Sequence, residues 1–187
     1  MRVVRQIVLA SLFVSALGAS AQQPQKIIAE KSEIRFVSKQ MNVPVEGRFR
    51  KFDATVAFDP AHPEATQAQF EVDTASIDLG SPEGEEEVRD KGWFNVAAFP
   101  KATFSSTSVK STGPGKFEAS GKLTIKGTSV DIVAPFTLRE AAGQRIVEGQ
   151  FPMKRLQFRI GQGPWSDTDT VADEVLVRFR FALPATR

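Results

Sequence analysis

Along most of the chain, apolar and polar residues alternate one for one, a period that fits a half-buried β-strand and does not fit a helix. Within residues 116–126, for example, Phe117 and Ile125 share one face with other apolar or small residues, while mostly lysines and glutamate occupy the other. Lys126 and Gly127 then interrupt the pattern before it resumes, which indicates a tight hairpin.

The same alternation recurs from residue 33 onward. The segments that it predicts as strands are 34–38, 45–49, 52–58, 66–73, 102–109, 116–126, 130–138, 145–153 and 175–183. One face of each is apolar and the other polar, as an antiparallel sheet allows. Closing so many strands on themselves removes exposed edges. We therefore predict an all-β fold, a single antiparallel and roughly eight-stranded β-barrel.

One segment, residues 78–99, breaks the alternation and predicts a short helix near residues 82–92 that crosses between two parts of the sheet. Ser81 suits the N-cap and Pro82 the first helical position. Four glutamates follow, which places negative charge at the helix N-terminus. Gly92 then ends the helix.

The N-terminal segment, residues 1–21, is typical of a secretory signal peptide. Arg2 and Arg5 precede an apolar run over residues 7–17, and small residues suited to cleavage follow it. The run is too short to span a membrane. We therefore expect a periplasmic protein whose mature domain covers residues 22–187, with no membrane span in the mature chain.

Charge and composition narrow the function. Without the two arginines of the signal segment, the 22 acidic residues are matched by an equal number of Lys and Arg. Nucleic acid is therefore not an expected partner, because no net positive field remains. The chain has no Cys and one His, His62, in a proline-rich turn. This excludes disulfides, thiolate chemistry and Cys-based or multi-His zinc sites, and we expect neither a metal nor a cofactor.

The interior of the barrel is either filled or hollow. Around Phe104, the strand at 102–109 offers only Ala102, Ser106 and Ser108 to the inside, so small residues either alternate with large ones to fill the space or leave a cavity. The aromatic residues are 15 Phe and 2 Trp without Tyr, which favours an apolar ligand over a sugar. A hydrocarbon that buries a few hundred Å² would gain roughly 5–10 kcal/mol before ordering costs.

The candidate ligand-binding residues are those on the predicted inner faces, together with the two aromatics that follow the helix near the opening. They are Phe36, Phe49, Trp93, Phe94, Phe104, Phe117, Leu123, Ile125, Val130, Ile132, Phe136, Phe151 and Phe179. Arg89, Lys126 and Arg155 are candidates to meet a headgroup at the barrel mouth. Each of these three also fits a paired or solvated surface cation.

Seven short motifs, in order along the mature chain, resemble the YceI-like family of periplasmic, lipocalin-like proteins. They are SEIRF at 32–36, VEGRF at 45–49, FDATVAFDP at 52–60, TASID at 74–78, RDK at 89–91, FPKATFSST at 99–107 and GKLTIKG at 121–127. The resemblance implies an extended antiparallel barrel that holds a polyisoprenoid, an isoprenoid quinone or a fatty amide in an internal tunnel. It therefore favours the hollow interior.

Two segments set this chain apart within that resemblance. Family members commonly carry a longer segment with a His before the FP motif, whereas this chain has the shorter GWFNVAA at residues 92–98. Trp93 is expected to replace that local packing. The tail at 154–161 and 165–168 resembles a subgroup that also occurs beside membrane b-type cytochromes, which makes such a cytochrome a candidate partner. A second copy of this chain, in a homodimer that completes the tunnel, is another candidate partner.

Acidic residues gather in one loop, at Asp167, Asp169, Asp173 and Glu174. The loop lacks the glycine and the spacing of a calcium loop, so a solvated turn is expected. We predict a non-enzymatic carrier of a long apolar ligand. Two alternatives remain: a structural or interaction module with a solid core, and a hydrolase that uses two of these carboxylates.

Overall fold

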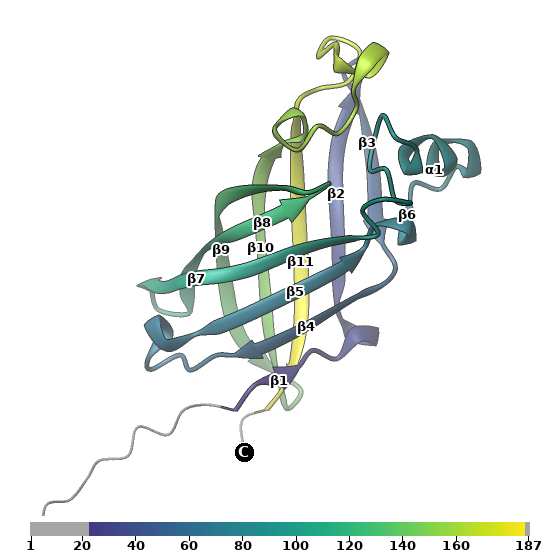
Figure 1. Ribbon diagram of the computed structural model, residues 1–187. Helices are drawn as coiled ribbons and strands as arrows, with labels where there is room; N and C mark the ends of the chain where they lie inside the picture. Colours follow the sequence, from purple (N-terminus) through teal and green to yellow (C-terminus); the bar gives the residue numbers. More distant parts are fainter. Residues whose placement is uncertain (1–22, 186–187) are drawn as a thin grey trace, which may run out of the picture.

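A computed structural model of the chain describes residues 23–185, so the predicted signal peptide at residues 1–21 lies outside the described residues. A single strongly curled antiparallel sheet makes up most of this part of the chain (Figure 1). Its strands are β1 (Gln25–Lys26), β2 (Glu33–Gln40), β3 (Val43–Phe49), β4 (Phe52–Ala57), β5 (Gln67–Asp73), β6 (Ile77–Asp78), β7 (Lys101–Gly113), β8 (Lys116–Ile125), β9 (Thr128–Ala141), β10 (Gln144–Lys154) and β11 (Glu174–Pro184).

The order of the strands is β1-β4-β5-β7-β8-β9-β10-β11-β2-β3-β6. Nine of the eleven strands are long, and β1 and β6 are two-residue strands at the two edges. The predicted all-β, antiparallel, lipocalin-like architecture is confirmed, with a slightly higher strand count because alternation cannot signal two-residue strands. The predicted hairpin is also confirmed, since Lys126 and Gly127 both have positive φ, as a tight turn between β8 and β9 requires.

The predicted helix is α1 (Pro82–Arg89), which ends three residues earlier than expected. Its N-terminus forms for the predicted reason, because Ser81 Oγ accepts a hydrogen bond from the Gly84 amide at 3.3 Å. Short 3₁₀ turns connect other strands; they are η1 (Ala29–Lys31), η2 (Pro63–Ala65), η3 (Thr74–Ser76), η4 (Arg155–Phe158) and η5 (Gly163–Ser166). No helix within residues 23–185 has the length and hydropathy of a membrane span.

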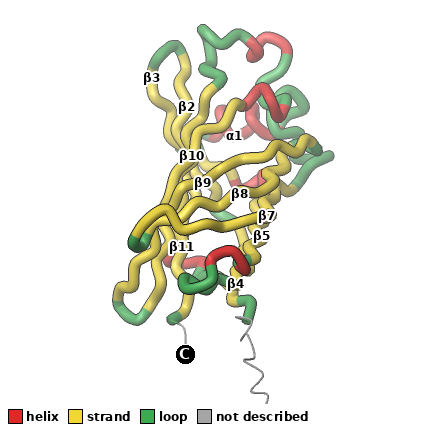
Figure 2. The backbone as a smooth tube through the Cα atoms, turned by 90° about the vertical axis from the view of Figure 1, so that its left-hand side faces the viewer, coloured by secondary structure: helices red, strands yellow, loops and turns green. Residues whose placement is uncertain are grey.

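The two ends of the curled sheet differ. The segment between β10 and β11, the β2–β3 hairpin and α1 gather at the upper end, whereas β1 and the end of β11 lie at the lower end (Figures 1 and 2). At the lower end, the buried Arg145 side chain donates to Phe58 O at 3.0 Å and to Gln25 Oε1 at 2.7 Å. Because it links β10 to β1 and to the residue after β4, Arg145 ties the two sides of the sheet together there.

One detail of β7 contradicts the sequence interpretation. The register between β7 and β8 shifts between Ser106 and Ser108, which is a β-bulge. The extra residue reverses the alternation, so Ser108 is exposed and Val109 is buried. Ser108 therefore does not face the interior as predicted, and a large side chain takes that place.

Candidate functional site

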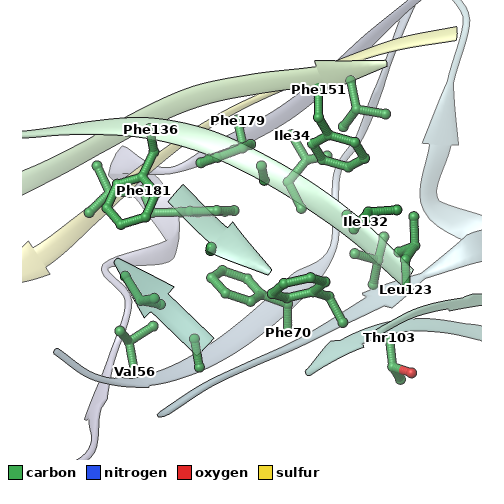
Figure 3. A pocket seen from close by; sticks show the side chains of 18 of the residues that line it. Ile34, Val56, Phe70, Thr103, Leu123, Ile132, Phe136, Phe151, Phe179 and Phe181 are labelled. Carbon is green, nitrogen blue, oxygen red and sulfur yellow. The ribbon is translucent and has the colours of Figure 1, made fainter. Parts of the chain in front are cut away.

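The inner face of the sheet encloses two adjoining cavities. The first, called here the narrow cavity, has a volume of about 160 Å³ and lies toward the lower end. Phe70 points into it from one side and Phe136, Phe151 and Phe179 from the other (Figure 3). Among the described residues that line it there is no charged side chain. Thr66 and Thr103 are the polar residues of this lining, and the Thr103 side chain points away from the cavity (Figure 3).

The second, called the wide cavity, has a volume of about 330 Å³ and lies toward the upper end. The ends of β2, β3, β10 and β11 form one part of its wall, and α1 and the segments that follow α1 and β10 form another. Residues of β5, β6, β7 and β8 complete it. Apolar side chains still dominate, but Arg35, Glu87, Trp93, Arg155 and Trp165 also line it. The wide cavity therefore combines an oily surface with polar groups, as small-molecule sites commonly do.

The two cavities share part of their walls. Six residues, called here the waist, line both: Ile34, Val72, Ala102, Leu123, Phe151 and Val177. Ala102 is the smallest of the six, and it is buried on β7. A chain-like molecule that filled both cavities would therefore pass the Ala102 side chain.

Three strand glycines leave room for phenylalanine rings to lie close to the sheet backbone. A Cβ atom at any of three glycines would overlap the ring of a neighbouring phenylalanine. The pairs are Gly47 with Phe36, Gly121 with Phe104, and Gly149 with Phe179. The sheet thus keeps these phenylalanines as wall, and the interior stays open despite its many rings.

Most of the predicted wall residues line one of the two cavities. The narrow cavity has Phe104, Leu123, Ile132, Phe136, Phe151 and Phe179, and the wide cavity has Phe36, Phe49, Trp93, Phe94, Leu123, Ile125 and Phe151. Phe117 and Val130 line neither. Phe117 belongs to the main buried cluster, where its ring stacks on Phe136 with centroids 5.4 Å apart, and Val130 packs against a second buried cluster.

Arg155 is the one predicted headgroup residue that lines a cavity. Its side chain is 2% exposed, and burial lowers the pKa of its guanidinium. Four backbone carbonyls accept its hydrogen bonds, namely Val171 O at 2.6 Å, Ile160 O at 2.9 Å, Ala172 O at 3.0 Å and Gly161 O at 3.1 Å. The guanidinium has five N–H donors. It is therefore occupied mainly in holding the segment between β10 and β11.

Lys126 and Arg89 line neither cavity. Lys126 is buried, and its Nζ donates to Lys91 O at 2.7 Å, Arg159 O at 2.9 Å and Gln162 Oε1 at 3.1 Å. Burial lowers the pKa of this amine, and the nearby Arg159 charge adds to the effect. The ammonium therefore joins the segment after α1 to the segment after β10.

Arg89 lies at the end of α1. Its Nε donates to Ala75 O and its Nη2 to Glu85 Oε2, both at 3.2 Å. The contact with Ala75 holds α1 against the turn before β6, and the contact with Glu85 lies within the helix. The geometry therefore gives Arg89 a positioning role outside the cavities.

Two tryptophans meet at the wall of the wide cavity. The rings of Trp93 and Trp165 have centroids 5.7 Å apart, and the Arg155 guanidinium carbon lies 5.9 Å from the centroid of the Trp93 ring. Trp165 Nε1 donates to Glu87 Oε1 at 2.7 Å, which joins α1 to the segment between β10 and β11. Trp165 is not among the predicted site residues. A large aromatic residue in a polar Gly/Pro loop is the signal that could have pointed to it.

Several other missed residues belong to predicted strands. Phe58, Phe70, Val72, Val177 and Phe181 line the cavities, and all five lie in segments whose alternation was recognised. Alternation shows which face of a strand a residue occupies. It does not show which inward residues border an empty space.

Two carboxylates of the acidic loop accept hydrogen bonds from nearby groups of the segment between β10 and β11. Asp167 Oδ2 accepts from Thr170 Oγ1 at 2.6 Å, and Asp167 Oδ1 accepts from the Asp169 amide at 3.1 Å. These hydrogen bonds lower the pKa of Asp167. Asp173 Oδ1 accepts from the Leu156 amide at 3.0 Å. Within residues 23–185, no three His, Cys, Asp or Glu side chains are placed to hold a metal ion.

A family model described as YceI-like domain matches residues 26–183. A curated relative, a UPF0312 protein of Azotobacter vinelandii, is 41% identical over 87 residues, which are 46% of this chain and 45% of the relative. The chain thus spans about half the length of the first curated relatives it matches.

Several solved structures resemble this one, and two of them are described here. The crystal structure of BcnA from Burkholderia cenocepacia is 42% identical, with a TM-score of 0.81, and the match covers 83% of this chain and 98% of BcnA. A polyisoprenoid binding domain from Saccharophagus degradans has a TM-score of 0.68 over 86% of this chain and 98% of that domain, at 18% identity. At that identity, the second likeness concerns the fold alone.

Proposed function

The chain belongs to the YceI-like domain family, and on this premise we propose that it is a periplasmic carrier that holds one long apolar lipid inside its sheet. The observation that carries the proposal is the pair of adjoining cavities, one of them without a charged lining residue. A lipid chain is long and thin, and two small cavities joined at a waist suit it better than a compact ligand. The leader-like residues 1–21 support the periplasmic setting.

An isoprenoid chain is the ligand class that we favour. The Saccharophagus degradans neighbour is described as a polyisoprenoid binding domain, and this chain has the same fold. The wide cavity alone, at about 330 Å³, reaches the lower limit of typical ligand pockets, about 300 Å³. Burial of the chain's methyl and methylene groups would supply most of the affinity, at about 25 cal/mol per Å².

The lining supports binding without chemistry. Acid–base or nucleophilic catalysis needs a titratable or nucleophilic group beside the reacting atoms. The Thr66 hydroxyl of the narrow cavity has no basic residue beside it in the lining of that cavity. In the wide cavity, Arg155 donates to backbone carbonyls and Glu87 accepts a hydrogen bond from Trp165 Nε1. Asp167 and Asp169 do not line either cavity, which disfavours a hydrolase built on them.

Blocking the waist tests the proposal. Ala102→Phe would place a ring between the two cavities, whereas Ala97→Phe adds the same ring at an exposed position outside both. We expect native mass spectrometry of the wild-type and Ala97→Phe proteins, secreted with their own leader, to show a co-purified lipid-sized adduct. The Ala102→Phe protein should lose it. A clean protein mass in all three, with no uptake of added prenyl lipid, would refute the carrier.

A further inference from the structure

Three arginines, called here the arginine row, lie side by side on the outer face of the sheet. Arg178 on β11 is directly opposite Arg35 on β2, and Arg35 is directly opposite Arg48 on β3. All three residues are exposed, and the residues before and after Arg178 and Arg35 line the cavities on the inner face. Like charges directly opposite each other on neighbouring strands destabilise a sheet. An anionic partner would offset this repulsion.

The carboxylates beside the arginine row do not neutralise it. Arg35 also borders the wide cavity, but its side chain is 54% exposed and its Nε donates to Glu33 Oε2 at 2.8 Å. Arg48 shares the Asp78 carboxylate with Arg50, which follows β3. Among the described residues, the arginine on β11 forms no ion pair. Four arginines therefore have two carboxylates between them, which leaves an excess of positive charge.

The other charged residues on the outer side of β10, β11, β2 and β3 balance one another. Positive and negative residues are equal in number there, with Lys39, Lys154 and Arg180 against Glu46, Glu148 and Glu174. The arginine row therefore sets the sign of the electrostatic potential on this face of the sheet.

Three apolar residues, called here the apolar strip, lie next to the arginine row on the same face. Pro152 on β10 is opposite Leu176 on β11, and Leu176 is opposite Val37 on β2. The residues before and after each of the three line the cavities, so these side chains point outward. Apolar side chains next to basic ones are typical of surfaces that bind the headgroup region of a membrane.

An anionic membrane fits this face better than a second copy of the chain does. A symmetric dimer brings the same patch of both copies together, so the two arginine rows would meet and repel each other. Guanidinium groups bind phosphates with two parallel hydrogen bonds, and a membrane presents phosphates beside an apolar phase. The inner side of the same four strands forms part of the wall of the wide cavity. Docking through the outer face would therefore hold that cavity beside the membrane.

We propose that the outer face of β10, β11, β2 and β3 docks reversibly on an anionic membrane surface. In the docked protein, the arginine row contacts lipid phosphates, and the apolar strip reaches the boundary between headgroups and acyl chains. The inference rests on the proposed carrier function and adds to it the surface at which the protein meets the source of its lipid.

Flotation with vesicles of phosphatidylcholine, made with and without phosphatidylglycerol, tests the docking face of the mature protein. We expect the wild-type protein to bind the anionic vesicles only and to be released as the salt concentration rises. Arg178→Gln combined with Arg35→Gln should weaken binding about thirtyfold, about fivefold for each charge. Lys110→Gln combined with Lys122→Gln removes the same charge from exposed positions on β7 and β8 and should leave binding unchanged. Because the row is repulsive, Arg178→Gln alone should not lower the thermal stability.

A fluorescent label checks which face meets the membrane. The chain has no Cys, so Leu176→Cys gives a single attachment site for a nitrobenzoxadiazole label on the apolar strip. Its emission should shift to shorter wavelengths on anionic vesicles, because the label enters a less polar environment. The same label at Ser105→Cys, an exposed position on β7, should show no shift.

Three results would overturn the inference while the carrier function stands. They are equal binding to vesicles without phosphatidylglycerol, equal weakening by the two double variants, and an emission shift at the β7 label without one at the apolar strip. Self-association of the wild-type protein that is lost in the double arginine variant would assign this face to a second copy instead.

Uptake of prenyl lipid from detergent micelles, with no vesicle present, tests the carrier function separately. The double arginine variant should take up the lipid as the wild-type protein does, because the substituted side chains lie on the outer face. A wild-type protein that takes up no lipid would refute the carrier function, whatever the vesicles show.

Discussion

The two cavities are built by different means. The narrow cavity is walled mainly by the sheet, and its rings support one another, as in the pairs Phe70–Phe181 and Phe179–Phe181 with centroids 4.6 and 5.3 Å apart. The wide cavity takes part of its wall from α1 and the segment between β10 and β11. There, buried side chains such as Arg155 and Lys126 bind backbone oxygens across the segments.

The two cavities therefore show two different ways of stabilising the structure around a cavity. Around the narrow cavity, the ladders and the apolar packing act together, and many residues each contribute a little. Around the wide cavity, irregular backbone has carbonyls that no ladder satisfies, and a few polar side chains satisfy them. Single substitutions should therefore have larger and more local effects at the upper end.

The largest effect is expected from Arg155→Met, which removes the donor of four carbonyl bonds from the wide cavity. We expect the free energy of unfolding to fall by about 3 kcal/mol, because buried carbonyls lose a charged donor. Amide exchange should quicken in residues 156–173 before it changes in β8 and β9. Lys154→Met, at the exposed neighbouring position, is the control. Uniform loss of protection over the whole sheet would contradict the contrast between the two ends.

A substitution that fills the narrow cavity should change which lipid chain lengths bind and should have little effect at the upper end. Ala119 and Ala134 lie opposite each other on β8 and β9, and both line the cavity. Ala134→Leu would occupy part of that space, so we expect about tenfold weaker binding of a long isoprenoid chain and unchanged binding of a short one. Calorimetry over a chain-length series measures this. Val133→Leu, on the exposed face of β9, should leave the whole series as in wild type.

A smaller effect is expected where a ring lies over a glycine in the wide cavity. A Cβ at Gly47 would overlap the Phe36 ring and approach Leu79, so Gly47→Ala should push the ring into the cavity. We expect ligand affinity to fall about threefold and stability by about 1 kcal/mol. Phe36→Leu in the same chain should restore the affinity, because it removes the overlapping atoms. If Glu46→Ala, on the exposed face, has the same effect as Gly47→Ala, the overlap is not the cause.

The smallest effect is expected from pH. Asp78 Oδ2 accepts from Arg50 Nε at 3.0 Å and from Arg48 Nε at 2.7 Å, and these hydrogen bonds hold the pKa of Asp78 well below its usual range. Because the carboxylate is favoured in the folded state, its contribution to stability is present above the unfolded pKa of about 4 and is lost as the pH falls below it. Acid titrations of unfolding for wild type and Asp78→Asn check this. The gap between the two curves should shrink steadily as the pH falls from about 4 toward the lowered folded-state pKa of Asp78, and parallel curves would contradict it.

Much of the architecture could be predicted from the sequence because it depends on local pattern. Alternation located the nine long strands, and the chemistry of Ser81 and Pro82 located the start of α1. The bulge at Ser106 and Ser108 was missed, because its cause is the pairing with β8 and not a turn residue.

The site was predictable only in part. Alternation identifies inward-facing phenylalanines such as Phe104 and Phe136. It does not show that Phe117 packs edge-on against Phe58 and stacks on Phe136, contacts that only the fold determines. The cations were harder still. A run such as residues 154–161 gives no sign that Arg155 turns inward to carbonyls up to 17 residues away. Contacts between a side chain and distant backbone produce no periodic pattern in the sequence.

The shared waist has a consequence for anyone who wishes to redesign the binding properties. Six residues belong to both compartments, so enlarging one compartment by trimming Val72 or Leu123 also reshapes the other. Independent adjustment must use residues that belong to one compartment only, such as Ala134 in the narrow cavity and Trp93 in the wide cavity. A library that varies these outlying positions and keeps the central six constant would change the two compartments separately.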